Sequence, residues 1–503
     1  MASGKQYLAG TALSYATFGF NAVAGLMYTP WMIGVIGQDQ YGLYTLALSM
    51  IQLFMTDVGL KTAVMGFLSR YYAAHENVKA RVFLGIAYKL YFALALVVAV
   101  IAAAVYFNAE AIFTALTPGE LEQFKGLYAV VALYSIVSLP CSPFEGILNV
   151  KERFIGVNLV TFVQKILTVG LIVVLLLLGS NVFALVFANA FVGALAEFSK
   201  YLIIRTTTDA HADLSAWDAS LARELIGYSG WQALGQCSEN LYSAASPIAL
   251  AMFADSIAVG YFGLASMIGG LMFSLGVVMR KIFMAKTGRI LAGNQANDNL
   301  QAFMEQVGRF QLCVLGLLLV GFVSVGQVFV CLWNEPAGVG ILYPCIVMML
   351  VPGLLRMVQD TGTAALIVSG DIRSYSLLQL AMAVVAIVVL VLSAAQLGAV
   401  SAGVAFLVSG LLRVAGQQAI LHKRFRVNVK SLVANTVGRW ILPAAVVSVA
   451  FYALSHALPW DSWGVLAAEA CAIAFVHSVG MAVFVLQPED KALIRRCLPG
   501  RSA

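Results

Sequence analysis

The chain has 503 residues, of which 61% are hydrophobic and only 11% charged, and its mean hydropathy is +0.89. Soluble domains carry roughly 25% charged residues, so this composition excludes a soluble globular protein and predicts an all-α polytopic membrane protein. The net charge of +6 does not indicate nucleic-acid binding, because most Lys and Arg residues fall between apolar segments and no stacking aromatic residues are interleaved with them.

About fourteen segments meet or approach the roughly 20 apolar residues that a membrane-spanning helix needs. The first follows Lys5 without a cleavage site and is predicted to be retained rather than removed as a signal peptide. Connections after odd-numbered spans contain no Lys or Arg, whereas those after even-numbered spans are basic, so both termini are predicted to be cytoplasmic. The predicted spans are 7–33, 42–66, 82–107, 124–148, 156–178, 183–204, 226–252, 257–280, 307–332, 341–367, 375–396, 399–421, 437–458 and 463–486.

The longest polar connection, 205–227, follows the sixth span and divides the chain. We predict a first six-helix lobe at 1–210, a cytoplasmic interlobe linker at 211–225, a second six-helix lobe at 226–421, and two additional helices with a cytoplasmic tail at 422–503. The connection itself could form an amphipathic helix on the membrane face. The fourth and tenth spans show a weak likeness, because both contain polar or small residues and end in a charged tight turn. Such a likeness suggests repeated lobes, which in transporters hold the substrate near their shared interface.

Several ionisable residues remain inside the predicted spans, where a central charge costs about 2.5–3.5 kcal/mol on insertion scales. Asp57 and Lys61 are four residues apart, as are Arg356 and Asp360, so each pair shares one helix face and forms either a structural clamp or a gate. Lys61 could also snorkel toward the inner surface.

Three cations lie deeper, about 13 to 22 Å along their helices, where snorkelling does not reach water. These are Lys165, Arg356 and Arg413. Because lipid-facing cations are not tolerated at this depth, their positions predict a water-filled cavity that receives an anion.

Signatures of covalent or nucleotide chemistry are missing from the sequence. There is no GxxxxGK[ST], no GxSxG and no histidine cluster, and the seven cysteines are scattered without a CxxC pair. We therefore expect no catalytic residue, no metal site and no cofactor, and we predict that the protein is not an enzyme.

Two stretches resemble the bacterial polysaccharide flippases of the O-antigen type, within the multidrug, oligosaccharidyl-lipid and polysaccharide exporter superfamily. They are TPWMIGVIGQDQYGLYTLALSMIQLFMTDVGLKTAVMGFLSRYYA, which begins at Thr29, and PFEGILNVKERFIGVNLV, which begins at Pro143. The resemblance implies two six-helix lobes around a central cavity. It also implies a substrate, an undecaprenyl-pyrophosphate-linked oligosaccharide of the O-antigen or exopolysaccharide pathway, that alternating access moves from the cytoplasmic to the periplasmic leaflet. Under this reading the anionic head group would meet Lys61, Lys165, Arg356 and Arg413.

The same resemblance implies the bacterial inner membrane as location. The implied partners are membrane lipids, with polysaccharide polymerase and chain-length machinery as further candidates, and no nucleic acid. A cation-coupled multidrug antiporter of the same superfamily is the main alternative. In it a gate or coupling ion would use the acidic residues Asp57, Glu197, Glu239 and Asp360. A membrane glycan polymerase or ligase is a weaker alternative because the longest outer connection has only about 16 residues, and a scaffold would not need buried cations in both halves.

Overall fold

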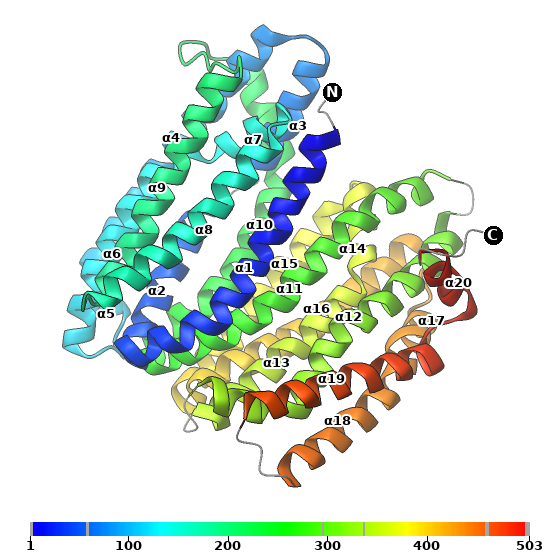
Figure 1. The fold of residues 1–503 in the computed structure, drawn as a ribbon. Helices are drawn as coiled ribbons and strands as arrows, with labels where there is room; N and C mark the ends of the chain where they lie inside the picture. Colours follow the sequence, from blue (N-terminus) through cyan, green and yellow to red (C-terminus); the bar gives the residue numbers. More distant parts are fainter. Residues whose placement is uncertain (1–3, 57–59, 294–295, 335–337, 458–461, 498–503) are drawn as a thin grey trace. The chain divides into compact units, whose positions relative to one another are not determined.

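The computed structural model describes residues 4–56, 60–293, 296–334, 338–457 and 462–497, and the regular structure within these ranges is helical (Figure 1). The first helices are α1 (Gly4–Ile36), α2 (Gln38–Phe54), α3 (Leu60–Ala73), α4 (Asn77–Phe107), α5 (Ala109–Ile112), α6 (Pro118–Ser138), the 3₁₀ turn η1 (Leu139–Cys141), α7 (Pro143–Val150), α8 (Phe154–Leu177), α9 (Val182–Thr207) and α10 (Ala219–Phe253).

The later helices begin with α11 (Ser256–Leu291) and end with a short helix at the C-terminus. They are α11, α12 (Ala296–Trp333), α13 (Val339–Val358), α14 (Asp360–Val368), α15 (Ile372–Leu397), α16 (Ala399–Phe425), α17 (Val429–Val433), the π-helical turn η3 (Ala434–Gly438), α18 (Arg439–Ala457), α19 (Trp463–Gly480), the π-helical turn η4 (Met481–Val485) and α20 (Pro488–Cys497).

Short polar residues set the starts of several helices. Thr117 and Glu120 form a reciprocal capping box at the start of α6. The side chains of Asn181 and Ser462 accept hydrogen bonds from backbone N–H groups at the starts of α9 and α19. These contacts satisfy N–H groups that have no partner inside the helix. The residues at these positions therefore determine where the helices start, even where the helix interiors are almost uniformly apolar.

Twelve helical segments in the described ranges are long and apolar enough to cross a membrane. They match twelve of the fourteen predicted spans and confirm the predicted all-α, polytopic fold class. One of the other two spans corresponds to α2 and α3, which flank residues 57–59 outside the described ranges. The other is α10, whose 35 residues are ample for a span but include many polar side chains. It is the polar side chains of α10, and not its length, that set it apart from the twelve apolar spans.

The fourth and tenth predicted spans are both interrupted. The fourth consists of α6, η1 and α7, and the tenth consists of α13 and α14 with Gln359 between them. In the fourth span Pro140 and Pro143 lack the N–H group that a continuous helix requires. In the tenth span the interruption falls at a glutamine, which has no such backbone restriction.

An offset of 218 residues relates several helix ends of the two halves. It separates the ends of α7 and α14 (Val150 and Val368), the starts of α8 and α15 (Phe154 and Ile372), and the ends of α9 and α16 (Thr207 and Phe425). The intervening turns also match. The N–H of Arg153 donates to the carbonyl of Leu148, as the N–H of Asp371 donates to that of Leu366. These equivalences support the predicted repeat.

The chain divides into two compact units, each with its own core. Unit 1 comprises Met1–Gly263 and Val391–Gly398, and unit 2 comprises Leu264–Leu390 and Ala399–Ala503. In unit 1 the rings of Phe67, Tyr71 and Phe83 pack with centroids 5.3 to 6.3 Å apart where α3 meets α4. In unit 2 buried Met304 and Leu421 belong to a core built from α12, α14 and α16. The predicted lobe boundaries at 210 and 226, and the central cavity, remain predictions.

The connection between α9 and α10 differs from the expected amphipathic helix. Residues 208–218 are not helical. The carboxylate of Asp213 accepts from the backbone N–H groups of Ser215 and Ala216, and Asp218 caps α10. These hydrogen bonds hold the pKa of both carboxyls below the usual range and favour turns over helix. The segment packs closely on α4, because a Cβ at Gly85 would lie 1.9 Å from the carbonyl oxygen of Asp213.

Candidate functional site

A polar seam runs along α1 and α8 in unit 1, and Lys165 lies on it. The hydroxyl of Ser14 donates to Asn158 Oδ1 at 3.1 Å, and the rings of Phe20 and Phe162 meet edge to face, so the two helices run parallel. Lys165 lies seven residues beyond Asn158 and therefore on the same side of α8. We call Ser14, Asn158, Thr161 and Lys165 the α1–α8 seam.

Lys165 is the exposed cation of this seam. It lies eleven residues into α8, a helix with a mean hydropathy of 2.4 over its most apolar window. Its side chain is exposed, and among the described residues it forms no hydrogen bond or ion pair. An ammonium group at this depth requires water or an anion, so the predicted anion-facing role of Lys165 is consistent with its surroundings.

A second polar seam joins the end of α2 to α10. Gln52 Nε2 donates to the hydroxyl of Ser243 at 2.9 Å, and Asn240 Nδ2 donates to that of Thr56 at 3.2 Å. Glu239 is half-buried on the same stretch of α10. These contacts explain why α10 is polar for a helix of its length. Asp57, the other acidic residue predicted here, lies outside the described residues.

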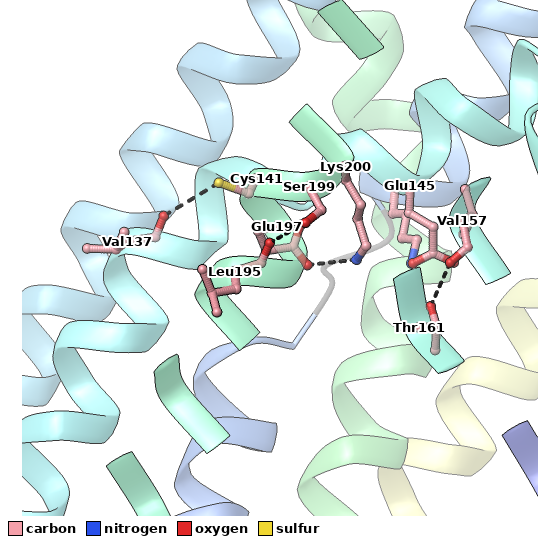
Figure 2. Close-up of polar contacts among 10 residues, drawn as sticks. Val137, Cys141, Glu145, Val157, Thr161, Leu195, Glu197, Ser199 and Lys200 are labelled. Carbon is pink, nitrogen blue, oxygen red and sulfur yellow. Dashed lines mark hydrogen bonds and ion pairs between the residues drawn. The ribbon is translucent and has the colours of Figure 1, made fainter. Parts of the chain in front are cut away.

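Two ion pairs gather where the broken fourth span meets its neighbours. Lys61 Nζ on α3 lies 2.5 Å from Glu145 Oε2 on α7, and both side chains are about one-third exposed, at 32% and 38%. Lys200 Nζ lies 2.7 Å from Glu197 Oε1 on α9, with both side chains mostly buried. Figure 2 shows Glu197 and Lys200 turned toward each other, and α7, which carries Glu145, packs on α9. The predicted partner of Lys61, Asp57, lies outside the described residues, so that pairing stays a prediction, and the structure shows Glu145 as a partner of Lys61.

In unit 2, Arg356 and Asp360 lie on either side of the break between α13 and α14. Arg356 is half-buried, with its guanidinium carbon 5.3 Å from the ring centroid of Phe273. Asp360 is buried at the first position of α14. Because the helix is interrupted between them, the regular i, i+4 geometry behind the predicted pair does not apply, and the pairing stays a prediction.

One face of α16 contacts the break. Gln417 Nε2 donates to the backbone carbonyl of Gln359 at 3.1 Å and to the hydroxyl of Thr363 at 2.9 Å. One turn earlier, Arg413 donates to the hydroxyl of Tyr375 at 3.2 Å. Arg413 is only 4% exposed. The predicted cavity cation is therefore packed inside unit 2 in this structure, where it contacts α15.

Among the ion pairs of the described residues, the most buried one is not predicted from the sequence. Arg309 on α12 binds Asp490 on α20 through two hydrogen bonds, of 2.6 and 3.1 Å, and both side chains are at most 3% exposed. Burial would raise the pKa of Asp490, but hydrogen bonds from Arg309, the Gln487 N–H and Gln306 outweigh it and lower the pKa. No sequence pattern indicates this pair, because Arg309 lies next to the predicted start of its span and Asp490 lies in the predicted tail, where charged residues are expected.

Comparison with known proteins establishes the fold. No protein-family model matches the chain, and no curated protein matches it in sequence. Among solved structures, the lipid II flippase MurJ in an inward closed conformation aligns with a TM-score of 0.75 and 11% identity over 97% of this chain and 100% of its own. An inward-facing multidrug resistance MATE family transporter of the MOP superfamily aligns with a TM-score of 0.61 and 14% identity over 80% of this chain and 98% of its own.

A third structure, a MOP superfamily transporter from Pyrococcus furiosus, aligns with a TM-score of 0.53 and 12% identity over 85% of this chain and 94% of its own. The fold is the one these transporters share. At such low identities the likeness concerns the fold alone, and the substrate must be argued from the residues of this chain.

Proposed function

We propose that the protein is an alternating-access transporter that moves an undecaprenyl-pyrophosphate-linked oligosaccharide, an O-antigen or exopolysaccharide repeat unit, from the cytoplasmic to the periplasmic leaflet of a bacterial inner membrane. The observation that carries the proposal is Lys165, an exposed cation without a protein partner among the described residues, eleven residues into an apolar helix. A pyrophosphate supplies the counter-charge that this position lacks.

The extent of the structural likeness supports a flippase over a drug antiporter. The MurJ alignment covers 97% of the chain and so takes in the two additional C-terminal helices, whereas the MATE alignment covers 80%. The bulk of a lipid-linked substrate also fits an exposed seam better than an enclosed pocket.

We assign different roles to the predicted cations. Lys165 and the half-buried Arg356 meet the anionic head group. Lys61, held by Glu145, acts at a gate that opens when the head group competes for the ammonium. Arg413 positions α16 against α15 through Tyr375. Glu197 is held by Lys200 and is assigned to the structure around that gate.

The α2–α10 seam favours one alternative, a cation-coupled multidrug antiporter. Its amides and hydroxyls, together with Glu239, form a polar surface on a helix long enough to span. A coupling ion could bind there, and proton-driven dye efflux by the reconstituted protein would be the sign of this activity.

The decisive experiment follows a fluorescent polyprenyl-pyrophosphate disaccharide in proteoliposomes, with dithionite quenching as the measure of its leaflet. We expect the wild type to move the probe and Lys165→Gln to do so roughly tenfold more slowly, because a charge-assisted contact is worth about 1.5–3 kcal/mol. Lys125→Gln, which removes an ammonium bound to Glu110 near the start of α6, is the matched control and should be neutral. Normal flipping by Lys165→Gln would contradict the role of Lys165, and dye efflux without flipping would support the antiporter.

A further inference from the structure

The hairpin of α18 and α19 buries a carboxyl group that none of the contacts above uses. The buried residues of α19 are Leu466, Glu469, Ile473 and His477, whose spacing places them on one stripe. Helix α19 packs against α12 and α18, and Figure 1 shows it beside α18. Glu469 is 4% exposed, and neither of its carboxyl oxygens has a hydrogen-bond partner within the described ranges. Glu469 is thus a buried acid without a protein counter-charge.

The contacts at the two ends of α19 fix the position of Glu469. The ring of Trp463 lies 6.2 Å from that of Phe329, and His477 bonds to the backbone of Leu312. Helices α12 and α19 are therefore antiparallel, and Glu469 lies between these two points. Between Cys313 and Cys331, α12 has no ionisable side chain. An ionised carboxylate would be unpaired in apolar surroundings there, which is strongly unfavourable. The arrangement therefore favours the protonated, neutral acid.

Further buried polar groups without partners lie near the end of α19 that carries His477. Nε2 of His477 has no hydrogen-bond partner in the described structure, nor do the two side-chain polar atoms of Gln311, next to Leu312 on α12. Both side chains are at most 3% exposed. His477 lies eight residues beyond Glu469, about 12 Å along the helix. Just beyond Gln311, Arg309 binds Asp490. His477 and Gln311 thus lie between Glu469 and that ion pair along the two helices.

The other ionisable groups on the elements packed against α19 are engaged elsewhere or distant. Arg309 is bound by Asp490, Glu305 accepts from Ser431 and Asn435, and His456 contacts Gln327. The turn η4 contributes none. The full set on α12 and α18 is Asp298, Glu305, Arg309, Cys313, Cys331, Arg439, Tyr452 and His456. None of the described hydrogen bonds or ion pairs joins any of these groups to Glu469.

We propose that Glu469 is a proton-binding site within the membrane, and that its proton exchanges with the aqueous phase through His477 and Gln311 on the side where Arg309 and Asp490 lie. On release the carboxyl O–H bond breaks, and water carries the proton to Nε2 of His477, where a new N–H bond forms. This leaves a carboxylate and an imidazolium, and the imidazolium then returns its proton to water. Because the carboxylate has no counter-charge in this packing, release favours a rearrangement of the α12, α18 and α19 seam.

Infrared difference spectroscopy of the purified full chain at different pH values tests the site directly. We expect one protonated-carboxyl C=O band whose intensity changes with pH, its loss in Glu469→Gln, and a shifted band in Glu469→Asp. The matched control is Glu489→Gln, an exposed residue on α20, which should leave the band unchanged. In His477→Phe the band should remain but exchange with deuterium severalfold more slowly. An unchanged helical circular dichroism spectrum verifies that each variant folds. If Glu469→Gln does not fold, the shifted band in Glu469→Asp tests the assignment instead.

Three results would overturn the proposal. The first is persistence of the band in Glu469→Gln, and the second is a Glu469 band that does not change over the pH range in which the chain stays folded. The third is a band removed by Na⁺ at constant pH, which would make the site one for sodium rather than for a proton. None of these results depends on the transported substrate, so the flipping assay and this test can fail independently.

Discussion

At the scale of single residues, the pair between Lys61 and Glu145 shows how a broken helix can carry a switch. Glu145 lies in the first turn of α7, directly after the interruption at η1, and Lys61 reaches it from α3. Gly146 lets α3 approach closely, since a Cβ there would lie 3.1 Å from Met65. Both charged side chains keep about a third of their surface exposed, so an incoming anion can compete for the ammonium group.

Double-mutant analysis of this pair separates a clamp from a gate. We expect Lys61→Met and Glu145→Gln each to lower thermal stability and the double variant to recover part of the loss, with a coupling of about 1 kcal/mol, because the side chains touch but are partly solvated. The exposed Lys79–Glu76 pair is the control and should couple more weakly. Purely additive losses would mean that the contact contributes nothing to stability. A double variant that regains stability but not flipping would identify the pair as a gate.

At the scale of elements, α20 is attached to the bundle through one buried ion pair. Asp490 bonds Arg309 twice and accepts from the N–H of Gln487 and from Gln306. Such multiple bonding compensates the desolvation of both charges, whereas removal of one partner leaves the other charge buried and unpaired. The short α20 therefore depends on a contact outside its own sequence.

We expect Asp490→Asn to cost about 3–5 kcal/mol and to release α20, because a buried guanidinium loses its counter-charge. Hydrogen exchange of α20 and thermal unfolding would measure the effect, with exposed Glu489→Gln as the neutral neighbour. Since folding lowers the pKa of Asp490, its contribution is present above the unfolded pKa and disappears as pH falls through the folded pKa. The stability gap between wild type and Asp490→Asn should narrow with that acidification, and a gap that is constant with pH would refute the assignment.

The elements also show what the sequence reveals and what it conceals. Long apolar runs and basic connections predict the spanning helices, because a membrane helix must be apolar over most of its length. The interruption at Gln359 has no proline or glycine at that position to predict it, and the side chain that bonds its carbonyl, Gln417, lies 58 residues away. Likewise Glu145, a partner of Lys61, lies 84 residues away in the sequence. The spacing of residues along a helix identifies only partners on that helix, so it does not predict pairs between residues of different helices.

At the scale of the whole molecule, the 218-residue offset predicts how the two halves are oriented in the membrane. Each predicted half contains six spans, an even number, so a repeat at this offset returns to the same side of the membrane. The turns at Glu152 and Gly370 share a positive φ, of 58° and 78°, and the same pattern of hydrogen bonds, which marks them as equivalent. Both precede a spanning helix, and basic residues lie in or just after both turns, Lys151 and Arg153 in the first and Arg373 in the second, so both should face the cytoplasm.

Cysteine labelling in a background without the seven native cysteines tests this orientation. Glu152→Cys and Ser369→Cys should resist a membrane-impermeant maleimide in intact cells and react after permeabilisation. Leu178→Cys and Gln396→Cys, which are exposed and themselves 218 residues apart at the far ends of α8 and α15, should react in intact cells. Ser369 lies beside Gly370, the equivalent of Glu152, so each pair samples corresponding places in the two halves. The pairs serve as controls for each other, because a repeat requires both members of a pair to behave alike. If Glu152→Cys and Ser369→Cys label from opposite sides, the halves are inverted and the parallel repeat is wrong. If all four sites reverse together, the repeat stands but the termini lie outside, which would overturn the positive-inside assignment and the proposed direction of transport.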